Sequence, residues 1–194
     1  PLITMETLTP LVAENIRFLD SAAPDDDTTK PSESAPVAVP LLVQFVRDWS
    51  SAGEKMRRMT YQPIVEAIVP FLLGRDNGPP RILCPGSGTG RLPYMIAEQL
   101  KGAQITALDP DANAQRAAAL MFNAAADDAP ISLPTRIFPS LHVSNNWAKT
   151  EHRLLHVDVP DVPIATIKSV EASTNVTFAV GSLEDAADEW EVGG

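Results

Sequence analysis

Apolar side chains recur at helical spacing through residues 41–73. Two helices are expected there, separated by a break at residues 50–53. Their apolar faces are marked by Leu42, Phe45, Val46 and Trp49 in the first helix and by Ile64, Ile68 and Leu72 in the second. A shorter amphipathic stretch over residues 11–19 predicts another helix, which is too short to be stable alone and is expected to dock on the rest of the chain.

Beyond residue 80 the pattern changes to alternating strands and helices. The expected strands are the short apolar runs 82–84, 104–108 and 176–180, and the expected helices cover residues 92–100 and 112–123. Consecutive β-α-β units imply a parallel sheet with helices packed on its faces. The sequence therefore predicts an α/β, Rossmann-like domain over residues 79–194.

A polar segment rich in Pro, Ser and Asp divides the region before this domain. It covers residues 21–40 and predicts a linker within an N-terminal helical region, residues 1–78. Between the two predicted helices of this region lies a basic cluster of Lys55, Arg57 and Arg58, for which a solvated helix face is the favoured interpretation.

Composition excludes several classes of function. The 194 residues carry a formal net charge of -10, which argues against a nucleic-acid partner. A run of about eighteen apolar residues is absent from the sequence, so neither a membrane span nor a membrane partner is expected. A single cysteine, Cys84, excludes an intrachain disulfide framework and favours the cytoplasm, with the nucleus as an alternative. His152 and His156 are four residues apart, which would suit a metal only on a helix, but residues 154–160 read as extended, so surface histidines are favoured over metal ligands.

The glycine-rich turn at residues 85–90, Pro-Gly-Ser-Gly-Thr-Gly, is the most informative motif. Glycines between a strand and a helix let the backbone approach a ligand at the carboxyl end of the strand. The third glycine of the dinucleotide fingerprint is replaced by Arg91, which disfavours a pyrophosphate. The alternative is an ordinary strand-to-helix turn.

An acidic residue follows the turn at a distance that suits a ribose. Asp109 ends the second strand 23 residues after Gly86, where a carboxylate can accept hydrogen bonds from ribose hydroxyls. A ribose without a pyrophosphate indicates a ligand of the S-adenosylmethionine type. A turn or helix cap formed with Pro110 and Asp111 is the alternative for this residue.

The third strand is followed by Gly181-Ser182-Leu183, where folds of this class hold an adenine. Ser182 is neutral, and a helix-capping box with Asp185 is its favoured interpretation.

Several blocks of the chain carry a family resemblance. They are QFVRDWS at residues 44–50, Gly53, Arg57, YQPI at 61–64, ILCPGSGTGRL at 82–92, Phe122-Asn123, Ser144-Asn145-Asn146 and VDVPD at 157–161. Together they resemble the carnosine N-methyltransferase family from about residue 41 to the end. The resemblance implies a class I methyltransferase fold and methyl transfer from S-adenosylmethionine to a histidine imidazole nitrogen in a small peptide.

The resemblance also implies which residues bind the cofactor. Gln44 and Arg47 match positions that help to hold it, and an arginine fork suits its carboxylate. The glycines of the turn match residues around its methionine portion, and Asp109 matches the ribose contact. The full set of candidate cofactor-binding residues is Gln44, Arg47, Gly86, Ser87, Gly88, Gly90, Asp109, Ser182 and Leu183.

Two departures from the family limit the expected activity. The family has Gly-Asp-Phe where this chain has Gly181-Ser182-Leu183, which removes a carboxylate from the adenine contact. Only three strands are found, whereas the family sheet has the order 3-2-1-4-5-7-6, so one edge of the first strand is expected to be open. The catalytic residues of the family lie beyond this point, and none is assigned here.

Three explanations of the missing strands stay open. The chain is a fragment with only the first half of the sheet, a partner chain completes the sheet, or the protein is a non-catalytic methyltransferase-like subunit that stabilises a partner. A homodimer is also expected from the resemblance.

Overall fold

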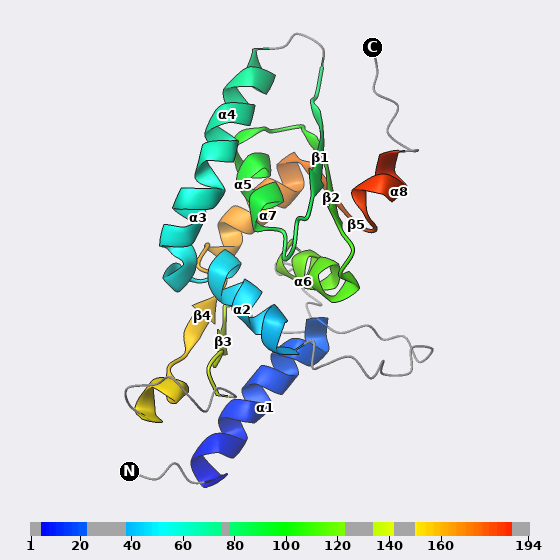
Figure 1. The fold of residues 1–194 in the computed structure, drawn as a ribbon. Coiled ribbons are helices and arrows are strands. Elements are labelled where there is room, and N and C mark those ends of the chain that lie inside the picture. Colours follow the sequence, from blue (N-terminus) through cyan, green and yellow to red (C-terminus); the bar gives the residue numbers. More distant parts are fainter. Residues whose placement is uncertain (1–4, 23–37, 75–77, 123–133, 142–149, 188–194) are drawn as a thin grey trace.

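The computed structural model describes residues 5–22, 38–74, 78–122, 134–141 and 150–187 (Figure 1). In chain order its elements are α1 (Met5–Ala22), α2 (Ala38–Trp49), η1 (Ser51–Gly53), α3 (Glu54–Thr60), α4 (Gln62–Leu73), β1 (Arg81–Pro85), α5 (Arg91–Gln99), β2 (Gln104–Asp109), α6 (Ala112–Phe122), β3 (Thr135–Ile137), η3 (Thr150–Leu154), β4 (Val157–Val159), α7 (Ile164–Ser173), β5 (Asn175–Val180) and α8 (Leu183–Ala187). None of the helices in these ranges is long and apolar enough to cross a membrane.

The centre of the structure is a parallel sheet with the strand order β1-β2-β5. Its three strands confirm those expected from the apolar runs, and the sheet is the first part of a Rossmann-like fold. Helices α5, α6 and α7 contact one side of the sheet, whereas α8 is drawn on the other side (Figure 1). Among the described residues β1 pairs with β2 alone, as the strand count predicts.

The N-terminal helices and the sheet share one hydrophobic core. Phe18 of α1 packs edge-on against Phe45 of α2, with ring centroids 4.5 Å apart, and both belong to the same buried cluster as Ile82 of β1. Asn15 fixes α1 further, because its side-chain amide donates to the Phe138 carbonyl at 2.9 Å and accepts from the Phe138 N–H at 2.8 Å. The prediction that the first helix docks on the rest of the chain is therefore confirmed.

The predicted helix boundaries need three corrections. The second helix of residues 41–73 is divided at Tyr61 into α3 and α4, because Pro63 has no N–H to continue the helical hydrogen bonds. Residues 21–22 and 38–40, at the two ends of the expected linker, are helical, since α1 extends to Ala22 and α2 begins at Ala38. Residues 23–37 and Asn123 lie outside the described residues, as do residues 144–146.

The sequence analysis also missed a second, antiparallel pair of strands, β3 and β4. Each has three residues, too few to show a period of two in the sequence. Strand β4 confirms the extended backbone expected near Pro160. The start of the expected extended segment is different, because Leu154 ends the helical turn η3, which also contains His152.

Candidate functional site

The predicted glycine turn joins β1 to α5 at the carboxyl ends of β1, β2 and β5, which we call the carboxyl edge. Gly86, Gly88 and Gly90 have φ angles of 67°, 52° and 83°, a region that side chains rarely adopt. The Ser87 N–H donates to the Leu108 carbonyl at 3.1 Å and ties the turn to β2. The turn is thus specified by its glycines and held beside the end of the second strand.

The three glycines have different surroundings. A Cβ atom at Gly86 would meet no atom within 4 Å, whereas one at Gly88 would lie 3.3 Å from Gln44 Oε1 and 3.5 Å from Arg47 Nη2. At Gly90 it would lie 2.9 Å from the Cβ atom of Ala118 on α6. Gly90 is therefore explained by close packing of the turn on α6, Gly86 faces open space, and Gly88 lies directly against Gln44 and Arg47 at the end of α2.

Asp109 lies across the carboxyl edge from the turn. Its Oδ2 accepts the N–H of Gly88 at 2.9 Å, and its Oδ1 accepts the N–H of Asp111, also at 2.9 Å. The alternative in which Asp109 forms a turn with the residues after it is therefore realised. The cap of α6 is Asp111 instead, since Asp111 Oδ1 accepts the N–H of Asn113 at 2.9 Å. Each carboxylate oxygen of Asp109 has a second lone pair, so these bonds still allow it to accept a ribose hydroxyl.

The end of α2 brings charged residues to the same turn. Arg47 donates through Nε and Nη2 to the two carboxylate oxygens of Asp48, at 2.6 and 2.7 Å. Asp48 also accepts from the hydroxyls of Tyr61 at 2.9 Å and Thr89 at 2.7 Å, and it is 0% exposed. The hydrogen bond with Asp48 raises the pKa of Arg47, and burial together with the Asp48 charge raises the pKa of Tyr61 to about 12.

Sequence reasoning gave no role to Asp48, although one signal was present. Asp48 lies three residues after Phe45 and next to Trp49, on the face of α2 that carries the apolar stripe. A carboxylate on such a face needs buried partners, because an unpaired buried charge is strongly unfavourable.

Two buried amide oxygens at this site have no hydrogen-bond partner within the described ranges. They are Oε1 of Gln44, which faces Gly88, and Oε1 of Gln115 on α6. The Gln115 side-chain amide donates instead to the hydroxyl of Ser87 at 2.7 Å. The predicted Ser87 side chain is therefore engaged within the protein, whereas Gln44 has an acceptor available to a bound ligand.

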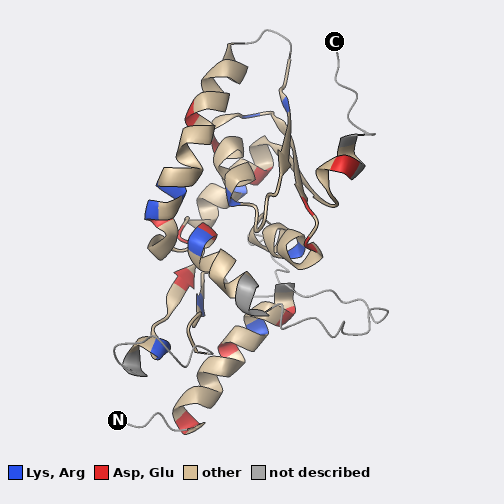
Figure 2. Cartoon of the chain, viewed as in Figure 1, with Lys and Arg blue, Asp and Glu red and all other residues tan. Residues whose placement is uncertain are grey.

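The basic cluster contains one residue that is not solvated, contrary to the favoured interpretation. Arg57 is only 5% exposed, donates to the carbonyls of Arg47 at 2.7 Å and Ser50 at 2.8 Å, and forms an ion pair with Asp161. Burial and the nearby Arg91 lower its pKa, and Asp161 opposes this effect. Lys55 and Arg58 are exposed on α3, as Figure 2 illustrates for the basic positions of this helix.

Asp161 links the buried Arg57 to α5, the helix that follows the glycine turn. It also accepts from Arg91 at 2.8 Å, and its backbone N–H donates to the Trp49 carbonyl at 2.7 Å. The Arg91 guanidinium lies 5.0 Å from the centroid of the Trp49 ring, and the indole N–H donates to the Thr89 carbonyl at 2.8 Å. The residue that replaces the third fingerprint glycine is therefore a structural contact between α5 and α2.

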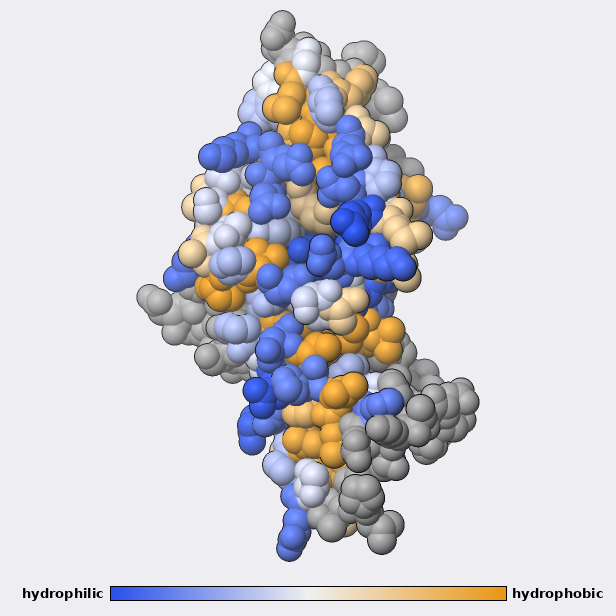
Figure 3. Space-filling view, turned by 90° about the vertical axis from the view of Figure 1, so that its left-hand side faces the viewer, coloured by the Kyte–Doolittle hydropathy of each residue, from blue (hydrophilic) through white to orange (hydrophobic). Residues whose placement is uncertain are grey.

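A groove of about 540 Å³ opens beside this cluster, between α3, α4 and α5. It is lined by Glu54, Arg57, Arg58, Gln62, Pro63, Glu66, Arg91 and Met95. Figure 3 shows a hydrophilic band across the middle of this side of the molecule, with hydrophobic residues above and below it. Side chains of both charges line the groove, and none of the predicted site residues is among them.

The segment after β5 reaches the carboxyl edge as expected. The Gly181 N–H donates to the Asp109 carbonyl at 3.1 Å, and α8 begins directly after Ser182. Ser182 is half-buried and the Leu183 side chain is 57% exposed. The Asp185 side chain of the predicted capping box lies outside the described part of the structure.

Cys84, His152 and His156 belong to no metal-ligating group within the described residues. His156 is exposed and His152 is half-buried, and the residues that the structure describes contain no group of three metal-ligating side chains. Cys84 is buried in the core, and burial raises the pKa of its thiol to about 11.

Comparison with known proteins identifies relatives of this chain. A family model described as carnosine N-methyltransferase matches residues 24–191. The carnosine N-methyltransferase of Rattus norvegicus is 47% identical over 58 residues, which are 29% of this chain and 14% of that protein. The Drosophila melanogaster relative, named carnosine N-methyltransferase unmet, is 42% identical over 58 residues, and the Schizosaccharomyces pombe protein is 41% identical over the same length. These alignments span only a small part of each curated relative.

Proposed function

Because this chain belongs to the carnosine N-methyltransferase family, we propose that its carboxyl edge binds S-adenosylmethionine and serves N-methylation of an imidazole in a histidine-containing peptide. One observation carries this proposal: the turn at Gly88 lies between the Asp109 carboxylate and the end of α2 with Gln44 and Arg47. The ribose and the amino-acid carboxylate of the cofactor both need polar partners, and this edge offers one to each.

The residues present fit such a ligand. A side chain at Gly88 would press against Gln44 and Arg47, so the missing Cβ leaves a cradle lined by an arginine and by an amide oxygen without a partner in the described residues. We assign Arg47 to the carboxylate of the cofactor and Asp109 to the ribose, with Gly86 and Gly88 beside the methionine portion. Ser182 and Leu183, which follow β5 at the same edge, are assigned to the adenine.

When bound, the cofactor supplies a methyl group on a sulfonium, which an imidazole nitrogen can displace in line. The protein then has to orient the two reactants and exclude water, rather than provide strong acid or base catalysis. A neutral imidazole is already nucleophilic near its ordinary pKa. The described residues account for the cofactor side of this arrangement, and we assign no catalytic residue among them.

Titration calorimetry with S-adenosylmethionine tests the proposal. The wild-type chain should bind, and Asp109→Ala should weaken binding about 10-fold or more, because a hydrogen bond to a charged group contributes about 1.5 to 3 kcal/mol. Asp158→Ala is the matched control, since its side chain is 64% exposed on β4. Absence of binding by a folded wild-type chain, or equal binding by wild type and Asp109→Ala, would contradict the cofactor assignment.

A methyl-transfer assay with carnosine then separates two candidate functions. The second candidate is a non-catalytic methyltransferase-like subunit that stabilises a partner chain. It is supported by the neutral Ser182-Leu183 pair and by the edge of β1 that has no strand partner among the described residues and could pair with a further strand. Cofactor binding without methyl transfer, together with a second chain in light scattering, would favour this candidate. A homodimer and a cytoplasmic location accompany either proposal.

A further inference from the structure

Asp48 is the most deeply buried charge at the carboxyl edge. It is 0% exposed and accepts four hydrogen bonds, two from Arg47 and one each from Tyr61 and Thr89. Four bonds satisfy all the lone-pair positions of a carboxylate, so Asp48 has no capacity left to contact a ligand. Any role it has in binding must act through its partners.

The geometry of the Arg47 fork indicates which partner matters. Asp48 takes the edge of the guanidinium formed by Nε and Nη2. A guanidinium has five N–H groups, and its other edge, formed by Nη1 and Nη2, can bind a second carboxylate in the same bidentate manner. This nitrogen Nη2 is the one that faces Gly88, at 3.5 Å from the position of a Cβ atom there. The Arg47 side chain is 41% exposed, so it would be free to adopt other rotamers without Asp48.

Asp48 is itself fixed to the glycine turn. The Thr89 hydroxyl belongs to the turn, and the Tyr61 hydroxyl comes from the junction of α3 and α4. The carboxylate therefore sets the distance between the arginine and the turn on which the methionine portion of the ligand would lie.

We propose that Asp48 is a positioning residue that acts through Arg47, holding one edge of the guanidinium so that the other edge receives the amino-acid carboxylate of the ligand. This inference rests on the proposed binding of S-adenosylmethionine. A different role, a clamp that only joins α2 to the turn, would support every part of the ligand equally. The two roles differ in the part of the ligand whose binding depends on Asp48.

Two ligands distinguish these roles: S-adenosylhomocysteine, which carries the amino-acid carboxylate, and 5′-methylthioadenosine, which lacks it. In Asp48→Asn we expect about a 10-fold loss of affinity for the first ligand, the size of one charge-assisted hydrogen bond, and less than a twofold change for the second. Tyr61→Phe is the matched control, because it removes one hydrogen bond from Asp48 and leaves the Arg47 fork in place. It should keep most of the preference for S-adenosylhomocysteine.

The ratio of the two affinities is the decisive readout. Partial unfolding weakens both apparent affinities by the same factor, so the ratio reports the geometry of the folded site alone. In an Arg47→Gln background, Asp48→Asn should change the ratio no further, since the residue through which it acts is gone. An equal loss of both ligands, or an additive effect in the double variant, would overturn the positioning role.

A second variant covers the case in which Asp48→Asn gives no folded protein. Arg47→Lys leaves the buried carboxylate paired with a cation but has no planar fork, so it should lose the preference for S-adenosylhomocysteine as well. A retained preference would overturn the inference. If the folded wild-type chain bound neither ligand, the proposed function would fail and this inference with it, whereas binding of both with equal strength would overturn the inference alone.

Discussion

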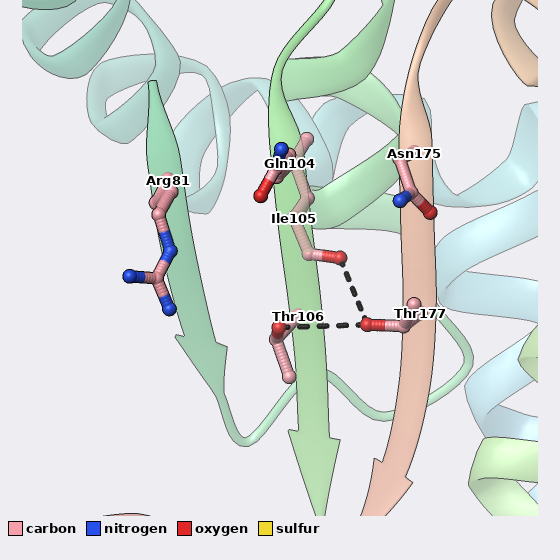
Figure 4. A pocket seen from close by; sticks show the side chains of 6 residues that line it. All are labelled: Arg81, Gln104, Ile105, Thr106, Asn175 and Thr177. Atoms are coloured by element: carbon pink, nitrogen blue, oxygen red, sulfur yellow. Dashed lines mark hydrogen bonds between the residues drawn. The ribbon is translucent and has the colours of Figure 1, made fainter. Parts of the chain in front are cut away.

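The carboxyl edge and the open face of the sheet use similar residue types in opposite ways. At the carboxyl edge, Thr89 donates to a fully buried carboxylate at 2.7 Å. On the face away from α5, α6 and α7, Thr177 is exposed and approaches the Ile105 carbonyl at 3.5 Å and the Thr106 hydroxyl at 3.4 Å (Figure 4). The same hydroxyl is thus a defined donor in one region and a loosely held surface group in the other.

This open face forms a shallow hollow of about 150 Å³, lined by Arg81, Gln104, Ile105, Thr106, Asn175 and Thr177. Alternation along each strand places the five polar side chains of this set opposite the buried ones, since Ile82 and Cys84 of β1 point to the covered side. Burial by helices, together with several fixed partners, therefore distinguishes the Thr89 hydroxyl from the Thr177 hydroxyl. Four substitutions test this distinction, in order of decreasing effect on stability.

Gly53→Ala should destabilise the end of α2, which lies at the carboxyl edge. A Cβ atom at Gly53 would lie 2.0 Å from the Arg47 carbonyl oxygen and 2.5 Å from that of Val46, and backbone atoms cannot yield as a side chain can. We expect the free energy of unfolding to fall by about 3 kcal/mol or more. Urea denaturation measures it, with Gly74→Ala as control, because a Cβ atom there would lie 3.6 Å from the Pro70 carbonyl oxygen, an ordinary van der Waals contact. Similar losses in both variants would contradict the close approach of α2 and η1.

Asp161→Asn should weaken the packing of α2 on α5. The substitution leaves Arg57 and Arg91 without their carboxylate, and we expect a loss of about 2 to 3 kcal/mol. Asp158→Asn is the control at an exposed ion pair whose closest atoms are 3.9 Å apart, where the change should stay below about 0.5 kcal/mol. Thermal and urea unfolding of both variants give the values. Equal free energies of unfolding for the two variants would show that the buried carboxylate contributes no more to stability than the exposed one.

Cys84→Ala tests the burial of the covered side of the sheet through the pH dependence of stability. Burial raises the pKa of Cys84 from 9.0 to about 11, so the folded state keeps this proton to higher pH than the unfolded state. The thiol's contribution is therefore complete below pH 9 and is lost between pH 9 and about 11, a decrease of about 2 to 3 kcal/mol. The free energy of unfolding of the wild type should fall more steeply over this range than that of Cys84→Ala. Parallel profiles would mean that the thiol is not desolvated.

The same substitution at two threonines makes the most direct comparison. Thr89→Val removes a donor from buried Asp48 and should lower the free energy of unfolding by about 1 to 2 kcal/mol. Thr177→Val on the open face should change it by less than about 0.5 kcal/mol. Urea denaturation of the pair is sufficient, and a larger effect at Thr177 would reverse the distinction between the two regions.

Local patterns explain what could be predicted. The strands β1, β2 and β5, the glycine turn and the docking of α1 all follow from short-range periodicity or from residues with special backbone freedom. The break at Tyr61 was also present in the sequence as Pro63, but an apolar pattern that continues on both sides of it concealed the break. The pair β3 and β4 left no such pattern, because three residues cannot show one.

The candidate site, like the fold, was predictable in part. The position at which a ligand could approach the backbone follows from the sequence, since three glycines with positive φ come after a strand and Asp109 ends the next strand. The family follows from it as well, through blocks of residues that stay recognisable out of context. Which charges are buried follows from the folded chain alone, because burial depends on residues far apart in sequence. Arg57 binds Asp161, which is 104 residues away in the sequence, and Asp48 binds Thr89, which is 41 residues away. The pattern of residues within each helix therefore cannot predict these contacts.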